Sequence, residues 1–139
     1  MTKNVWITIN GTQTTDGQSE TIEMVSQGNY FKKNGKHYIL FEEQMEGEKE
    51  VCHNTIKIMP HCMELIRKGT ARTHMIFEIG KEIITGYQTP IGELMMGICT
   101  NRFQIMEEEG LIEINAEYSL SINDEHVSDC CIKVTVRNR

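Results

Sequence analysis

Residues 112–123 alternate between apolar and polar side chains without a break. The even-numbered positions hold Ile, Ile, Ala, Tyr, Leu and Ile, and the odd-numbered positions hold Glu, Asn, Glu, Ser, Ser and Asn. A period of two places all the apolar residues on one face of a β-strand and all the polar residues on the other. The pattern predicts a long strand with one face against a core and the other in water.

The remainder of the chain divides into segments of the same kind, separated by turn residues. Asn34-Gly35 is the strongest short signal for a β-hairpin, and Thr89-Pro90-Ile91-Gly92 places proline and glycine in their usual turn positions. Within the second segment we expect a bulge at Gly28, and after the third an acidic tip around Gly47. About ten strands are expected, at residues 4–13, 20–33, 36–44, 51–59, 62–67, 72–79, 82–88, 93–106, 112–123 and 126–137.

The connections between these segments are all of hairpin length, which makes consecutive strands antiparallel. No segment keeps a helical period for three turns. A meander of this many strands, apolar on one face, must curl to cover that face and its edges. The sequence therefore predicts an all-β protein, an up-and-down antiparallel β-barrel of about 8–10 strands, in a single domain spanning residues 1–139.

The interior of such a barrel is either filled by side chains or left with a pocket at one mouth. Nine methionines are present, and methionine suits both irregular cores and adaptable apolar pockets. By parity, we expect the inward-facing set to be Val5, Ile7, Ile9, Ile22, Met24, Ile56, Ile58, Met75, Phe77, Ile79, Leu94, Met96, Ile98, Ile112, Ile114, Tyr118, Leu120, Ile132, Val134 and Val136.

Composition narrows the classes of function. The chain carries 14 Lys and Arg against 20 Asp and Glu, a formal charge of −6, which argues against general binding to nucleic acid or anionic membranes. No apolar leader or membrane-length apolar run is present. The five cysteines include no C-x-x-C pair and are expected to be reduced thiols, so we expect a cytoplasmic protein.

Catalytic and metal-binding motifs are not evident in the sequence. His53 and His61 each neighbour a cysteine, but adjacent residues of a strand point to opposite faces and cannot chelate one ion locally. No glycine-rich phosphate loop opens a helix. We therefore expect no metal and no cofactor. An enzyme using a histidine near a cysteine stays an alternative, with His74 and Cys99 as its candidates.

The segment from residue 67 to residue 100 is the richest in polar groups that could meet a ligand at a barrel mouth. Ligand sites in barrels combine an apolar cup with a few convergent polar groups. The candidate ligand-binding residues are Arg67, Arg72, His74, Tyr87, Thr89 and Thr100, together with Tyr118, the inward residue of the 112–123 strand that carries a polar tip.

The same segment resembles the YwiB-like β-barrel family of low-GC Gram-positive bacteria. The matching residues are Arg67-x-Gly69, Phe77-x-x-Gly80, Thr85-x-Tyr87-x-Thr89-x-x-Gly92-x-Leu94 and Thr100. That family is similar to the calycins, the lipocalin and fatty-acid-binding-protein group, and its function is unknown. The resemblance implies a calycin-like barrel in a bacterial protein. It also implies that Trp6 on the first strand stacks with Arg137 on the last and closes one end.

Two functions from different classes follow. The first is non-catalytic binding of a small apolar or amphipathic molecule at one barrel mouth. The second is a protein–protein interaction or self-association module, such as a homodimer, that uses the outer face of the barrel. Neighbouring apolar residues motivate the second, since one of each pair must face outward: Ile39 and Leu40, Ile83 and Ile84, Met95 and Met96.

Overall fold

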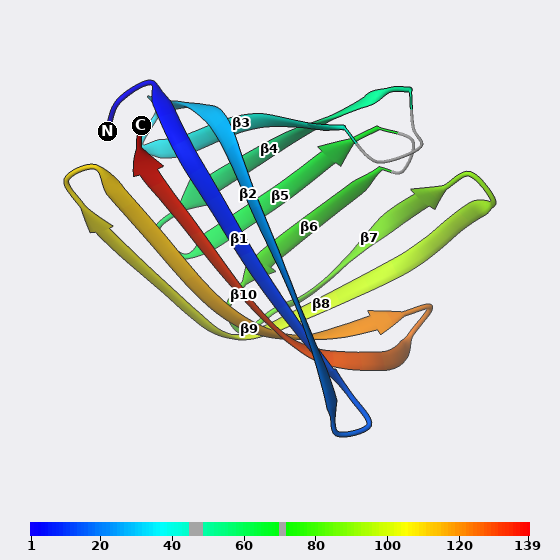
Figure 1. The fold of residues 1–139 in the computed structure, drawn as a ribbon. Coiled ribbons are helices and arrows are strands. Elements are labelled where there is room, and N and C mark those ends of the chain that lie inside the picture. The colour runs from blue at the N-terminus through cyan, green and yellow to red at the C-terminus, as the bar shows by residue number, and fades with distance from the viewer. Residues whose placement is uncertain (45–48, 70–71) are drawn as a thin grey trace.

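The computed structural model describes residues 1–44, 49–69 and 72–139, and the expected acidic tip around Gly47 lies outside them. The described residues form ten strands and no helix (Figure 1). They are β1 (Asn4–Thr15), β2 (Gln18–Lys33), β3 (Lys36–Gln44), β4 (Val51–Met59), β5 (Cys62–Lys68), β6 (Thr73–Glu78), β7 (Glu82–Thr89), β8 (Gly92–Glu108), β9 (Leu111–Ile122) and β10 (Glu125–Asn138).

The strands make one antiparallel sheet in the order β6-β5-β4-β3-β2-β1-β10-β9-β8-β7. The first and last strands of the chain pair over a long register, so the two ends of the sequence lie in the middle of the sheet. The sheet then curls until its outer strands meet. Arg72 and Gln88 exchange two backbone hydrogen bonds of 3.1 Å, and the Gly80 N–H donates to the Thr100 carbonyl at 3.0 Å. The result is the predicted all-β, up-and-down antiparallel barrel, nearly closed.

The core fills one part of this barrel. Phe77, Ile58 and Met63 are fully buried, and the Phe77 ring meets the Tyr118 ring edge-on at 4.9 Å. Two residues expected to face the interior are exposed instead: Ile22 at 72% and Ile79 at 48%. The first lies on β2 opposite Gly11 of β1, outside the stretch of β2 that pairs with β3, and the second lies in the turn after β6. Both have the expected parity, but the residues that the structure describes do not pack over them closely enough to bury them.

The predicted bulge at Gly28 is wrong. β1 and β2 pair without a register shift through this residue. Shifts occur in β8, between Thr100 and Arg102, and in β10. Gly28 has a different role, because a Cβ there would lie 2.6 Å from both the Leu40 carbonyl oxygen and the Ile7 side chain. Glycine lets β2 pass this close to β3.

From Gly28 toward the β1–β2 turn, β2 leaves β3. The two strands pair from Asn29 to Lys33 of β2, opposite Lys36 to Leu40 of β3. β2 continues along β1 as far as Gln18, and β3 continues along β4 as far as Gln44. Figure 1 shows the two strands running apart beyond this point, which leaves a fork in the wall of the barrel.

The stacking expected between Trp6 and Arg137 takes a different form. The two residues are register partners on β1 and β10, but the guanidinium over the Trp6 ring belongs to Arg139, at 5.8 Å from the ring centroid. Arg139 reaches it because its backbone N–H donates to the Asn4 carbonyl. The Trp6 ring lies on the outer face, 40% exposed, and does not close the barrel end.

Candidate ligand-binding site

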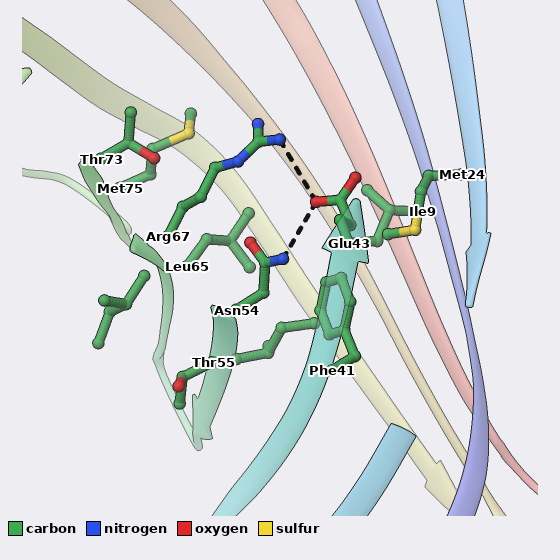
Figure 2. A pocket seen from close by; sticks show the side chains of 12 residues that line it. Ile9, Met24, Phe41, Glu43, Asn54, Thr55, Leu65, Arg67, Thr73 and Met75 are labelled. Atoms are coloured by element: carbon green, nitrogen blue, oxygen red, sulfur yellow. Dashed lines mark hydrogen bonds and ion pairs between the residues drawn. The ribbon is translucent and has the colours of Figure 1, made fainter. Parts of the chain in front are cut away.

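A small cavity opens on the inner face of β1–β6, toward the end of the barrel where β3 ends at Gln44 and β5 ends at Lys68. Its volume is about 160 Å³ (Figure 2). Apolar side chains make up most of its wall: Ile9, Met24, Phe41, Ile56, Leu65 and Met75. The polar residues in the wall are Glu43, Asn54, Thr55, Arg67 and Thr73.

Sheet register explains this arrangement. Ile58, Met63 and Phe77 form one row across β4, β5 and β6, and all three are fully buried. The next inward row, one pleat nearer the mouth, is Ile56, Leu65 and Met75. The row after that is polar.

That polar row consists of Asn54, Arg67 and Thr73, opposite Phe41 on β3. The inner face therefore changes from fully packed to apolar and open, and then to polar, over three successive pleats. This gradient is what gives the cavity its apolar floor and polar rim.

Glu43 joins the polar residues at the rim. Its Oε1 accepts a hydrogen bond from Asn54 Nδ2 at 3.0 Å and forms an ion pair with Arg67 Nη2 at 3.5 Å (Figure 2). Both charged side chains are partly buried. The rim thus presents a carboxylate, an amide and a guanidinium within reach of one another, with no net charge.

The candidate residues from the sequence do not converge on this cavity. Arg67 lines it. Tyr87, Thr100 and Tyr118 lie elsewhere on the inner face: Tyr87 packs against the core, and the other two are buried in it. Burial, together with the nearby Cys130 thiol, raises the pKa of the Tyr118 hydroxyl. Within the described residues, the Thr100 hydroxyl has no hydrogen-bond partner.

The other three candidates lie outside the interior. His74 has the opposite parity to Met75 and Phe77, and its Nε2 is 2.6 Å from Glu64 Oε1 on the outer face. Arg72 forms the β6–β7 bridge described above, and the Thr89 hydroxyl donates to the Gly92 carbonyl in the β7–β8 turn. Cys99, the partner considered for a catalytic His74, follows the buried Ile98 and so has outward parity on β8.

Sequence reasoning missed Glu43 and Asn54, which complete the cavity rim. Both share the inward parity of Phe41 and Ile56, and this parity was a usable signal. Acidic and amide side chains are also typical of a hairpin tip, so the residue types suggested a solvent-exposed turn and outweighed the inward parity.

A second polar cluster was also missed, because its members are distant in sequence. The Tyr30 hydroxyl lies 2.6 Å from His37 Nδ1, and His37 Nε2 lies 2.9 Å from Glu107 Oε1. The cluster joins β2, β3 and β8. Burial, and the nearby Glu107 carboxylate, raise the pKa of Tyr30. In this cluster a carboxylate, Glu107, holds the imidazole of His37. The cluster lies at the end of the barrel opposite the cavity rim.

Metal binding finds no support in the part of the chain that the structure describes: no group of three His, Cys, Asp or Glu side chains there could hold an ion. Within the same residues, no helix is long and apolar enough to cross a membrane.

The fold and the cavity define a class: ten-stranded up-and-down barrels with a small amphipathic opening at one end. The profile of a family described as "Domain of unknown function (DUF1934)" matches residues 7–134, and the chain belongs to this family. A curated relative is the "Uncharacterized beta-barrel protein YwiB" of Bacillus subtilis (strain 168), 27% identical over 119 residues, covering 84% of this chain and 82% of that protein.

A solved structure shares the fold. The crystal structure of the YwiB protein from Bacillus subtilis superimposes with a TM-score of 0.86, covering 99% of this chain and 92% of that chain at 20% identity. The expected YwiB-like β-barrel family is thereby confirmed.

Proposed function

We propose that this protein is a non-catalytic binding protein, which holds one small amphipathic molecule in the cavity between β1 and β6. The observation that supports it most directly is the gradient along the inner face, with an apolar floor of Ile56, Leu65 and Met75 below the polar rim of Glu43, Asn54 and Arg67. Ligand sites in proteins combine these two features, because apolar contact supplies affinity and a few polar groups fix orientation.

The volume of the cavity limits the size of the ligand. A void of about 150 Å³ lined by apolar side chains is known to accept a molecule the size of benzene. At about 160 Å³ this cavity suits a body of similar size. Long acyl chains exceed it.

The rim indicates the polar group of the ligand. A hydroxyl can donate to the Glu43 carboxylate and accept from Arg67 or Asn54. A carboxylate would be repelled by Glu43, and an ammonium by Arg67. We therefore expect a neutral head group that both donates and accepts hydrogen bonds, on an apolar body. The calycin-like character of the barrel is part of this proposal.

The test compares three probes that share one ring: benzyl alcohol, benzoate and benzylamine. Each is titrated at millimolar concentration into isotope-labelled protein while the amide and methyl resonances of the cavity residues are followed by NMR. Benzyl alcohol should bind several-fold more tightly than the two charged probes and should shift Leu65 and Met75. If all three probes leave these resonances unmoved, the protein does not bind ligands of this class.

A matched pair of variants locates the site. Leu65→Trp fills the cavity from its floor and should abolish binding of benzyl alcohol. Ile84→Trp adds the same bulk on the outer face, where Ile84 is exposed, and should leave binding intact. Circular dichroism checks that both variants fold. Equal binding by the two variants would place the probe outside the cavity.

Outer-face association is the second candidate, favoured by a specific observation. Leu40, Ile84 and Met95, the outward members of three apolar pairs, are each at least two-fifths exposed. Contiguous exposed apolar side chains are typical of contact surfaces, and Ile84 and Met95 are near neighbours across the β7–β8 ladder. Light scattering over a range of protein concentrations tests this function. A concentration-dependent dimer that Ile84→Lys or Leu40→Lys disperses supports it, and a strict monomer counts against self-association.

A further inference from the structure

The strand β2 has one edge with a partner for most of its length and one edge with a partner for a short part of it. Toward β1 it pairs continuously from Gln18 to Asn29. Toward β3 it pairs from Asn29 to Lys33. Within the described residues, the stretch 18–28 therefore has an edge with no neighbouring strand. We call this stretch the free edge of β2.

The backbone groups on the free edge can be assigned. The Tyr30 N–H donates to the Lys3 carbonyl, so Tyr30 directs its peptide groups toward β1. In an antiparallel strand, successive residues direct their peptide groups to opposite sides. With no register shift between β1 and β2, residues with odd numbers point the other way. Thr21, Glu23 and Val25 thus present their N–H and C=O groups to the fork.

Unpaired strand edges are usually protected by lysine, proline, a bulge or a covering segment, because they can pair with other chains. The stretch 18–28 contains no lysine, arginine or proline, and no bulge. It carries Glu20 and Glu23. Ile22 is 72% exposed on one face and Val25 is 58% exposed on the other. This edge is chemically open to pairing.

A groove lies beside the start of the free edge, where the strands diverge. It has a volume of about 530 Å³ and is lined by residues of β2, β3 and β4. Its walls include Gln27 on β2 and Leu40 and Glu42 on β3. An extended segment that pairs with Thr21, Glu23 and Val25 would continue into this groove, since the free edge and the groove meet at Gln27.

The charges distinguish between possible partners. Two copies of the chain pairing edge to edge would bring Glu20 and Glu23 of one copy near the same residues of the other, and like charges across strands are destabilising. A basic segment would instead be attracted to these residues and to Glu42. The two faces of the sheet also indicate the pattern of the partner segment. Glu23 and Glu42 lie on the outer face, whereas Ile22, Met24 and Phe41 face inward, so basic and apolar residues should alternate along the segment.

We propose that the free edge of β2 binds an extended segment of a partner protein in which Lys or Arg alternates with apolar residues. The segment adds to the sheet as a further strand, with its backbone hydrogen-bonded to Thr21, Glu23 and Val25. Its basic side chains lie on the outer face near Glu23 and Glu42, and its apolar side chains lie over Ile22 and Met24. The two sites share Met24, which lies in the wall of the small-molecule cavity, but the strand pairing itself does not use the cavity floor on β4, β5 and β6.

The probe is a fluorescein-labelled peptide of about seven residues, an ordinary strand length, that alternates lysine and valine. Fluorescence anisotropy measures its affinity for the full chain. A second peptide with the same composition but with its lysines and valines in two blocks controls for general attraction to an acidic protein. The alternating peptide should bind about tenfold more tightly than the block peptide, and its affinity should fall as salt is added.

Matched variants test the backbone pairing. Val25→Pro removes one N–H from the free edge and spares the β1 ladder, and proline is tolerated on strand edges of this kind. It should weaken binding about tenfold, whereas Val25→Ala, which keeps the N–H, should stay within about threefold of the unmodified protein. Glu23→Gln should weaken binding and lower its salt dependence. Binding that is equal in Val25→Pro and Val25→Ala overturns the proposal.

Hydrogen exchange gives a test without any variant. The amides of Thr21, Glu23 and Val25 should exchange fast in the free protein and slow down when the alternating peptide is added. Protection confined to other strands would contradict the proposal. So would dimers in light scattering that Val25→Pro disperses, because the edge would then serve a second copy of this chain. The Leu65→Trp variant, whose cavity is filled, should bind the peptide normally. Failure of the small-molecule proposal can therefore be distinguished from failure of the peptide proposal.

Discussion

Gly28 lies on β2 at a point where the backbone of β3 and a core side chain of β1 leave no room for a side chain. Any β-carbon there would lie 2.6 Å from the Leu40 carbonyl oxygen, a backbone atom that cannot rotate away, and equally near the end of Ile7. Gly28→Ala must push β2 and β3 apart or distort Ile7 in the core. We expect it to lower the free energy of unfolding by about 2–4 kcal/mol, as measured by urea denaturation.

Gly11 on β1 provides the control for this prediction. It also lies in the middle of a strand, but no atom lies within 4 Å of the position its Cβ would take. Gly11→Ala should change stability by less than about 1 kcal/mol. If both variants lose a similar amount of unfolding free energy, then the strands tolerate alanine poorly in general, and the close approach at Gly28 is not the reason for its glycine.

Tyr118 makes the stability of the barrel depend on alkaline pH. In the unfolded chain its hydroxyl ionises near pH 10, whereas burial raises its pKa in the folded protein. Between these two values the unfolded state binds fewer protons than the folded state. The free energy of unfolding should therefore fall as pH rises above about 10, by at most ~1.4 kcal/mol per pH unit from this residue.

Tyr118→Phe should flatten that decline, and denaturation at a series of pH values measures it. Tyr38→Phe is the matched control, because Tyr38 stacks on Phe31 on the outer face of the barrel. The decline should persist in that variant. An unchanged decline in Tyr118→Phe would assign the alkaline instability to other groups.

Parity along the strands correctly predicted which face of the sheet most side chains occupy. It did not predict which inward-facing side chains are buried by other residues. Val134 and Ile114 are fully buried as expected. Ile22 has the same parity as Met24 but lies on a stretch of β2 that does not pair with β3, which periodicity cannot reveal. The contacts of Glu43 with Asn54 and Arg67 depend on the register of three strands, so they too required the structure.

At the scale of the elements, nine antiparallel pairings join the ten described strands, whereas the closure between β6 and the β7–β8 hairpin rests on few backbone hydrogen bonds. It consists of the Arg72–Gln88 pair and the bond from Gly80 to Thr100, together with side-chain packing. This seam is the weakest junction between strands in the described part of the barrel. Local opening of the barrel should therefore begin there.

Gln88→Pro tests the seam. The Gln88 N–H donates to Arg72 across the junction, so proline removes a seam bond and leaves the β7–β8 ladder largely intact. We expect hydrogen exchange to speed up at least about tenfold in β6 and to stay unchanged in β9 and β10. Gln88→Ala keeps the N–H and should exchange like the unmodified protein. Faster exchange in every strand alike would contradict a local opening at the seam.

The strand boundaries were largely predictable because strong turn residues separate them. Asn34-Gly35 and Asn123-Asp124 adopt the positive φ angles that such turns require. The sequence does not mark the place where β2 leaves β3, because both strands keep their alternation beyond it. Gly28 is the one sequence feature near the fork. A glycine inside a strand is equally compatible with a β-bulge, which the structure does not have at this position.

At the scale of the whole molecule, the barrel has a closed end, filled by fully buried side chains such as Ile58 and Phe77, and an open end, where the cavity lies. The closed end holds both termini and the β8–β9 turn (Figure 1). The Tyr30–His37–Glu107 cluster joins β2, β3 and β8 at this end. The open end holds the cavity rim, the fork and the projecting β1–β2 hairpin. Stability is expected to come from the closed end, and the two binding surfaces that we propose lie at the open end, where side chains are not committed to the core.

Two hairpin truncations of equal length test this division. Replacing residues 14–19 by Asp-Gly joins Gln13 to Glu20, which are register partners, so the shorter turn fits the ladder. The deleted residues lie beyond the core, and stability should change by less than about 1 kcal/mol. Replacing residues 107–112 by Asp-Gly likewise joins the partners Met106 and Glu113.

The second truncation removes the buried Ile112 and the Glu107 carboxylate that holds His37. A lost core side chain and an imidazole nitrogen left without its partner should together cost about 4–6 kcal/mol in the free energy of unfolding. Urea denaturation compares the two truncations directly. Similar losses at both ends would mean that the barrel is uniformly cooperative, with no separation between a stabilising end and a binding end.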